Sequence, residues 1–167
     1  MIQQHLLCKI QKSYLWLKAS NEKAKNNLIE EAGKRGISSD RIVFANYVEF
    51  DQHLTRHSQG DLFLDTFNYN AGSTAVISLL SGLPLLTLYG NCYHSRMSSS
   101  ILKSLDLDEL IAYDKDEYQE KAYFLATNPE EIKKIKDKLA DKLKDPVYFN
   151  SSIFTKELES KYKTIYL

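Results

Sequence analysis

The chain has 167 residues, which is enough for one domain with a substantial core. Its 22 Lys and Arg residues balance 22 Asp and Glu residues, so a nucleic-acid binder that relies on bulk positive charge is excluded. Hydrophobic residues make up 43% and charged residues 26%, which are values of a globular chain. No apolar run is long enough for a transmembrane helix, and we expect no membrane partner.

The two cysteines, Cys8 and Cys92, are too few for a disulfide framework or a cysteine-based metal site. The first residues show no apolar signal core that ends in a small-residue cleavage site. We therefore expect a reducing, cytoplasmic location and no metal-binding residues.

Helical and strand patterns alternate along the first two thirds of the chain. In chain order, we predict a helix at 2–12, a strand at 13–18, a helix at 21–34, a strand at 41–45, a helix at 49–57, a strand at 61–65, a helix at 73–81, a strand at 84–88, a helix at 95–105 and a weak strand at 110–112. Asn21 is expected to cap the second helix, and Gly36 to follow its end.

This alternation predicts an α/β fold, in which a doubly wound, Rossmann-like parallel sheet has helices on both faces. From about residue 114 only helices are expected, at 114–126, 129–144 and 153–166. Pro129 suits the first position of its helix, and Pro146 interrupts the chain after it. We expect residues 1–167 to form a single domain whose helical tail wraps the sheet.

A candidate ligand site follows the third predicted strand, at 65–74. In a sheet of this kind, ligands bind beyond the carboxyl ends of the strands. Small residues up to Gly72 leave backbone N–H groups uncovered where the next helix begins, and Ser73 and Thr74 add hydroxyl donors, which suits a phosphate group. Plain helix capping explains the same residues, and spacing alone slightly favours it.

The other features in and around this segment are explained without a ligand or a catalytic role. There is no Gly-x-Gly-x-x-Gly and no Gly-Lys-Ser/Thr, so neither a dinucleotide fingerprint nor a Walker loop is present. Asp65 and Asn70 are expected to bond the loop backbone. Cys92 has no evident His or Asp partner in sequence order, so we do not expect a nucleophile there. Trp16 is expected in the core.

Residues 64–87 begin with Leu-Asp-Thr, continue through Asn-Ala-Gly-Ser-Thr and end with Gly-Leu-Pro-Leu-Leu-Thr. This pattern resembles the carboxyl-terminal catalytic region of the O-linked N-acetylglucosamine (O-GlcNAc) transferases, which include the plant SPINDLY-type proteins. That family has a Leu-Asp-Thr strand end, a loop that ends in Asn-x-His-Thr-Thr, a helix and then Gly-x-Pro-x-x-Thr. The likeness extends over nearly the whole chain, through Trp16-Leu17, Arg41 to Phe44, His53-x-x-Arg56, Ser95-Arg96, Leu107 to Ile111 and the segment from Pro146 to Tyr162.

The resemblance implies the carboxyl-terminal lobe of a two-lobed, B-type glycosyltransferase. Such a lobe holds the nucleotide of UDP-N-acetylglucosamine, and the family transfers the sugar to Ser or Thr of proteins without a metal or other cofactor. The matching positions are Gly72, Ser73 and Thr74 for the diphosphate, and Val48, His53 and Arg56 for the uracil and ribose.

Three positions depart from the family pattern. Gly72 replaces the motif histidine, Ile77 replaces an Asp that holds the ribose, and Phe50 replaces a Lys found in some members. Loss of one charged hydrogen bond to the ribose would weaken binding by about 1.5–3 kcal/mol, or roughly 10- to 150-fold.

The family's amino-terminal lobe, its tetratricopeptide repeats and a Gln and Lys on the diphosphate all precede the matched region. No repeat of about 34 residues is visible in this chain. We therefore expect no catalytic residue here and no turnover by the chain alone; the alternative is a truncated, non-catalytic nucleotide-binding or remnant module. Expected partners are a UDP-sugar, a protein acceptor and either an amino-terminal lobe or a second copy. Self-association would involve Phe67, Tyr69, Tyr89 and Tyr93.

Overall fold

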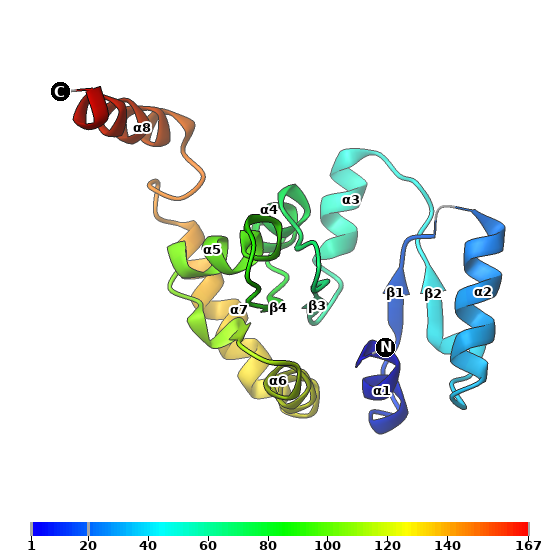
Figure 1. The fold of residues 1–167 in the computed structure, drawn as a ribbon. Coiled ribbons are helices and arrows are strands. Elements are labelled where there is room, and N and C mark those ends of the chain that lie inside the picture. Colours follow the sequence, from blue (N-terminus) through cyan, green and yellow to red (C-terminus); the bar gives the residue numbers. More distant parts are fainter. Residues whose placement is uncertain (1, 20, 167) are drawn as a thin grey trace.

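The computed structural model describes residues 2–19 and 21–166, and its helices and strands alternate as expected for an α/β fold (Figure 1). The elements are α1 (Ile2–Lys9), β1 (Leu15–Leu17), α2 (Glu22–Gly33), β2 (Ile42–Phe44), α3 (Phe50–His57), β3 (Phe63–Leu64), α4 (Ser73–Leu80), β4 (Leu85–Leu88), α5 (Met97–Ser104), β5 (Ile111–Ala112), α6 (Lys115–Thr127), α7 (Pro129–Leu143) and α8 (Ser151–Tyr166). Short 3-10 turns lie at Ser39–Arg41 (η1), Tyr93–Ser95 (η2) and Asp108–Leu110 (η3). Each predicted helix and strand is present, most of them slightly shorter than predicted.

Local capping explains where several helices begin. The Asn21 side chain accepts a hydrogen bond from the backbone N–H of Ala24 at 2.8 Å, as predicted. Asp114 caps α6 by accepting from two backbone N–H groups, and Pro129 is the first residue of α7. These signals act within one helical turn, so they are readable in the sequence.

The strands form two hydrogen-bonded parts. β1 pairs with β2 in parallel, and β3, β4 and β5 form a parallel three-stranded sheet in that order. Among residues 2–19 and 21–166, no ladder joins the two-stranded part to the three-stranded part. The α/β class is confirmed, and the carboxyl ends of the strands in both parts point to the same side of the molecule (Figure 1).

The main core lies around β4, whose neighbouring leucines face opposite sides. Leu85 packs in a cluster with buried side chains of α4, α5 and α7, whereas Leu86 packs with α6 and with Leu6 of α1. Both leucines are fully buried. Helices therefore cover both faces of the three-stranded part.

The helix α1 links the two parts. Leu6 packs in the cluster beneath the three-stranded part, and the next residue, Leu7, packs with α2 and β2. The Arg41 guanidinium donates to the backbone oxygens of Leu7, Ile10 and Ser13 at 2.9, 2.7 and 3.0 Å. This fork holds the end of α1 against the two-stranded part.

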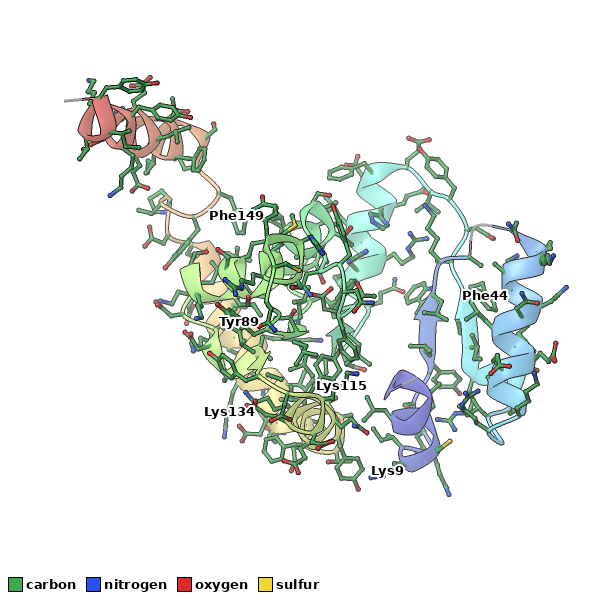
Figure 2. The ribbon with its side chains drawn as sticks, viewed as in Figure 1. Lys9, Phe44, Tyr89, Lys115, Lys134 and Phe149 are labelled. Atoms are coloured by element: carbon green, nitrogen blue, oxygen red, sulfur yellow. The ribbon has the colours of Figure 1, made fainter. Side chains whose placement is uncertain are left out.

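Two expectations from the sequence are wrong. Trp16 is 43% exposed rather than in the core: the Arg56 side chain of α3 lies over its ring, but none of the hydrophobic clusters formed by the described residues includes it. The tail does not wrap the sheet along its whole length: α6 and α7 pack on the body, but α8 has no buried residue and extends away from it (Figure 1). Phe149 lies in the segment that joins α7 to α8 (Figure 2). None of the helices in the described part of the chain is long and apolar enough to cross a membrane.

Candidate functional site

The segment after β3 is tied down by a buried carboxylate. Asp65 is 1% exposed, and its Oδ1 accepts from the backbone N–H groups of Thr66 and Ala71, both at 2.8 Å. Its Oδ2 accepts from the Thr87 hydroxyl at 2.7 Å, which joins the loop to β4. The Tyr118 hydroxyl donates to the Asp65 backbone oxygen at 3.2 Å; burial, together with the charge of Asp65, raises the pKa of Tyr118. The expected structural role of Asp65 is therefore confirmed.

Neighbouring elements hold the same loop from its other side. The Asn70 side-chain amide donates to the Thr66 backbone oxygen at 2.7 Å, and the Asn70 backbone N–H donates to the His94 oxygen at 2.8 Å. The Ser98 hydroxyl of α5 donates to the Ala71 oxygen at 2.8 Å. These bonds fix the direction in which the chain enters α4.

The start of α4 is open and lacks a side-chain cap. Gly72 is the N-cap residue, and a Cβ atom there would lie 2.5 Å from Cε of Met97. Ser73 and Thr74 are exposed, and their backbone N–H groups have no acceptor among the described residues. Side-chain capping, the competing interpretation, is therefore absent at this helix. What remains is a helix N-terminus with N–H and hydroxyl donors at the carboxyl edge of the sheet, which favours an anion.

The residues predicted for the uracil and ribose lie on and just before α3. Val48 is half-buried in the segment that leads to this helix. The Arg56 guanidinium donates to the Asn46 backbone oxygen at 2.8 Å and to Nδ1 of His53 at 2.7 Å, and it lies 5.9 Å from the centre of the Trp16 ring. Sequence reasoning missed the contacts of Arg56 with Asn46 and Trp16. Asn46 lies in the segment before α3 and Trp16 lies in β1, and both meet the Arg56 side chain only in the folded chain.

Burial and nearby positive charge lower the pKa of both histidines of α3, which favours their neutral form. Burial, then the positive charges of Arg56 and Lys18, lowers the pKa of His53. A neutral His53 can accept from Arg56 through Nδ1, which leaves the proton on Nε2. Burial, then the neighbouring His53 and Arg56, lowers the pKa of His57, whose ring centre lies 4.4 Å from that of His53. Nδ1 of His57 is buried and has no hydrogen-bond partner among the described residues.

The two predicted groups lie on neighbouring helices, since α3 packs against α4 and both helices start on the side of the carboxyl ends (Figure 1). Within the described residues, no hydrogen bond or ring contact joins Val48, His53 or Arg56 to the 72–74 segment. Ile77, which replaces the family's ribose-binding Asp, is half-buried on α4, one turn after Thr74.

The loop after β4 forms a further wall of this edge. The charged groups of Arg96 and Lys103 lie 5.1 and 5.3 Å from the centre of the Tyr89 ring; Tyr89 is labelled in Figure 2. Arg96 donates to the backbone oxygens of Gly90 and Asn91, so it is bound to its own loop. Of the residues expected to mediate self-association, Tyr69 and Tyr93 are exposed, whereas Phe67 packs edge-on against Tyr118 and Tyr89 is half-buried.

The site is an edge and not a closed pocket. A hollow of about 330 Å³ lies elsewhere, between α6 and α7, where Phe124, Leu125 and Ile135 line it. In the described part of the chain, no group of three or more His, Cys, Asp or Glu side chains could hold a metal ion. The donors that the predicted site residues offer are backbone N–H groups, hydroxyls, the His53 imidazole and the Arg56 guanidinium.

Residues 2–158 match the model of a protein family described as glycosyl transferase family 41. The chain is 30% identical over 114 residues to the probable UDP-N-acetylglucosamine–peptide N-acetylglucosaminyltransferase SPINDLY of Solanum lycopersicum, which covers 68% of this chain. It is 26% identical over 165 residues to SPINDLY of Arabidopsis thaliana, which covers 96% of the chain. The UDP-N-acetylglucosamine–peptide N-acetylglucosaminyltransferase of Caenorhabditis elegans is 29% identical over 134 residues, or 80% of the chain.

The same fold is found in a solved structure of a mutant O-GlcNAc transferase from Thermobaculum terrenum, with a TM-score of 0.91 and 24% identity. The match covers 98% of this chain but 32% of that one. Similarly, the chain spans 12% of the Solanum and Caenorhabditis relatives and 18% of the Arabidopsis relative.

Proposed function

The chain belongs to glycosyl transferase family 41, and on that premise we propose that it binds the donor in a transferase that moves N-acetylglucosamine from UDP to Ser or Thr of proteins. The observation that carries this proposal is the start of α4. There, Ser73 and Thr74 are exposed at the carboxyl edge of a parallel sheet, and their backbone N–H groups have no acceptor among residues 2–19 and 21–166. The similar proteins support the proposal, because the names of the Solanum and Caenorhabditis relatives describe UDP-N-acetylglucosamine–peptide N-acetylglucosaminyltransferases.

Charge development explains how this arrangement would assist transfer. As the bond between the sugar and UDP breaks, the leaving diphosphate gains negative charge. The N–H groups at the start of α4, with the hydroxyls of Ser73 and Thr74, stabilise that charge without a metal. The buried Asp65 carboxylate keeps the loop in place before donor arrives, so little order has to be gained on binding.

The base of the nucleotide would lie beside α3. Neutral His53 offers a ring face for stacking, and its Nε2–H has no acceptor in the described part of the chain, so it can donate to the base. The Val48 backbone would read the edge of the uracil. Arg56, fixed by Asn46 and Trp16, holds His53 in position.

Titration calorimetry with UDP tests this proposal. Replacement of both hydroxyl residues, Ser73→Ala with Thr74→Ala, should weaken UDP binding by about 3 kcal/mol or more, roughly 150-fold, because two hydrogen bonds to a charged group are lost. The control is Ser100→Ala, which removes an exposed hydroxyl from neighbouring α5 and should leave the affinity unchanged. No heat with UDP at millimolar concentration would overturn the proposal.

A non-catalytic nucleotide-binding module is the second candidate. The chain spans less than a fifth of the three relatives compared above, so the activity, substrates and acceptors of whole transferases do not follow from the match alone. We expect residues 1–167 to bind UDP but to transfer no labelled sugar to a Ser/Thr peptide. Measurable transfer would overturn this expectation and favour the enzyme. A cytoplasmic location belongs to the same proposal, and the two free cysteines are consistent with it.

A further inference from the structure

The loop after β4 brings a thiol and an imidazole together. Sγ of Cys92 lies 3.2 Å from Nε2 of His94 and 3.1 Å from the Ser95 hydroxyl oxygen. Cys92 and His94 are both exposed, whereas Ser95 is buried. The sequence-based expectation that Cys92 has no partner is therefore wrong. The two residues are separated by Tyr93: Cys92 is the N-cap of the 3-10 turn η2 and His94 lies within this turn, and no motif in the sequence indicates their contact.

Other groups fix the geometry of this pair. The Tyr69 ring stacks on the His94 ring, with centres 5.7 Å apart and planes at 17°. The His94 backbone oxygen accepts from the Asn70 N–H, which ties the turn to the loop before α4. The Ser95 hydroxyl donates to the Cys92 backbone oxygen at 3.0 Å. A nucleophile within hydrogen-bond reach of a base that a third group orients is the arrangement that activates thiols.

The second cysteine provides a contrast within the same chain. Cys8 is also exposed, but its thiol donates to the Arg35 backbone oxygen at 3.4 Å. A carbonyl oxygen accepts this hydrogen bond but is not a base that could take the thiol proton. An imidazole with a bare nitrogen can instead take the proton and leave the thiolate, which is the nucleophilic form.

We propose that Cys92 is a nucleophilic thiol, activated by His94, that exchanges with small-molecule disulfides at the surface of the β4–α5 loop. Nε2 of His94 takes the thiol proton, and Sγ of Cys92 attacks one sulfur of the disulfide. The new bond between Sγ and that sulfur forms as the original sulfur–sulfur bond breaks. The departing thiolate takes the proton from His94, so one disulfide replaces another and no further oxidant is needed. This inference does not depend on nucleotide binding.

Alkylation by iodoacetamide near neutral pH tests the reactivity, with each cysteine followed by mass spectrometry of its own peptide. An ordinary thiol is only a few per cent thiolate at neutral pH, so we expect Cys92 to react about ten-fold faster than Cys8. Equal rates, or a faster Cys8, would overturn the proposal.

Two variants separate the role of the imidazole from damage to the turn. His94→Asn should reduce the rate at Cys92 to that at Cys8, and an unchanged circular dichroism spectrum reports that the chain is still folded. Tyr93→Asn places the same new side chain at the adjacent exposed position and should keep Cys92 fast. A Cys92 rate that survives His94→Asn contradicts activation by His94.

Incubation with glutathione disulfide tests the exchange itself. We expect a single mixed disulfide per chain in the intact mass, located on the Cys92 peptide and lost in Cys92→Ser. An adduct that forms first on Cys8, or no adduct at all, would refute the exchange step.

Discussion

The two parts of the sheet differ in how their apolar strands are covered. In the three-stranded part, Leu85 and Leu86 point to opposite faces, and both are fully buried by helices. In the two-stranded part, Ile42 is buried on the face that α2 covers, but Trp16 and Val43, which are register partners, are 43% and 41% exposed on the other face. The same kind of short apolar run thus gives a sealed core in one place and an open face in the other.

The difference in helix coverage indicates which part of the sheet supports each half of the candidate site. The loop of Asp65 and the start of α4 belong to the sealed part, so the proposed diphosphate donors rest on a core closed from both sides. The proposed uracil residues depend on α3, which contacts both parts: His57 stacks near Phe63 of β3, and Arg56 lies over Trp16 of β1. We therefore expect the diphosphate half to be rigid and the uracil half to be easier to perturb.

The largest effect should come from the core of the sealed part. Leu85→Ala removes a fully buried side chain at the centre of the three-stranded sheet, and we expect it to lower the free energy of unfolding by about 3–4 kcal/mol. Val43→Ala on the open face should lower it by less than about 1 kcal/mol. Urea unfolding followed by circular dichroism measures both. Similar costs for the two changes would show that the open face is covered in solution and would break the comparison.

The next largest effects should come from the polar side chain that ties down each part of the sheet, which is Asp65 in the three-stranded part and Arg41 in the two-stranded part. Asp65→Ala removes three hydrogen bonds to a buried carboxylate and should lower the free energy of unfolding by about 3 kcal/mol while it weakens UDP binding. Arg41 is half-buried, and Arg41→Ala removes the hydrogen bonds by which its guanidinium holds the end of α1. We expect this change to lower the free energy of unfolding by about 1.5–2 kcal/mol. Unfolding and UDP titration on the same samples measure both quantities. If Arg41→Ala weakens UDP binding as much as Asp65→Ala does, the two parts act as one rigid unit.

The smallest effect is a pH dependence of stability, which arises from the two histidines of α3, the helix that contacts both parts of the sheet. The pKa values of His53 and His57 are lowered from 6.5 by burial first and by nearby positive charge second. The unfolded chain therefore binds protons at a higher pH than the folded chain, and stability falls as the pH drops below about 6.5 toward the folded pKa values. Urea midpoints at about pH 7.5 and about pH 5.5 should show this loss.

His57→Gln is the matched variant, because it removes the histidine whose Nδ1 is buried without a partner in the described structure. The variant should show a shallower loss of stability over the same pH interval. A loss as steep as in the unaltered chain would assign the pH dependence to groups elsewhere, such as the carboxylates.

Much of the site could be predicted because its signals are local. The run of small residues at 71–73 after a strand marks a helix start with uncovered N–H groups, and the structure has such a start at α4. Asp65 could be assigned a structural role because its partners in the loop are close in sequence. The fork of Arg41, the support of Arg56 by Trp16 and the stacking of Tyr69 on His94 could not be predicted, because each joins segments that meet only in the folded chain.

The sequence by itself determined the order of helices and strands, the cap of α2 at Asn21, the start of α7 at Pro129 and the α/β class, because hydrogen bonds within a turn and apolar periodicity act over a few neighbouring residues. Only the tertiary structure decided that the sheet has two hydrogen-bonded parts, that Trp16 is exposed and that α8 stands apart from the body. Those outcomes depend on which helix covers which face, and such coverage is a property of contacts between distant segments that no single stretch of sequence encodes.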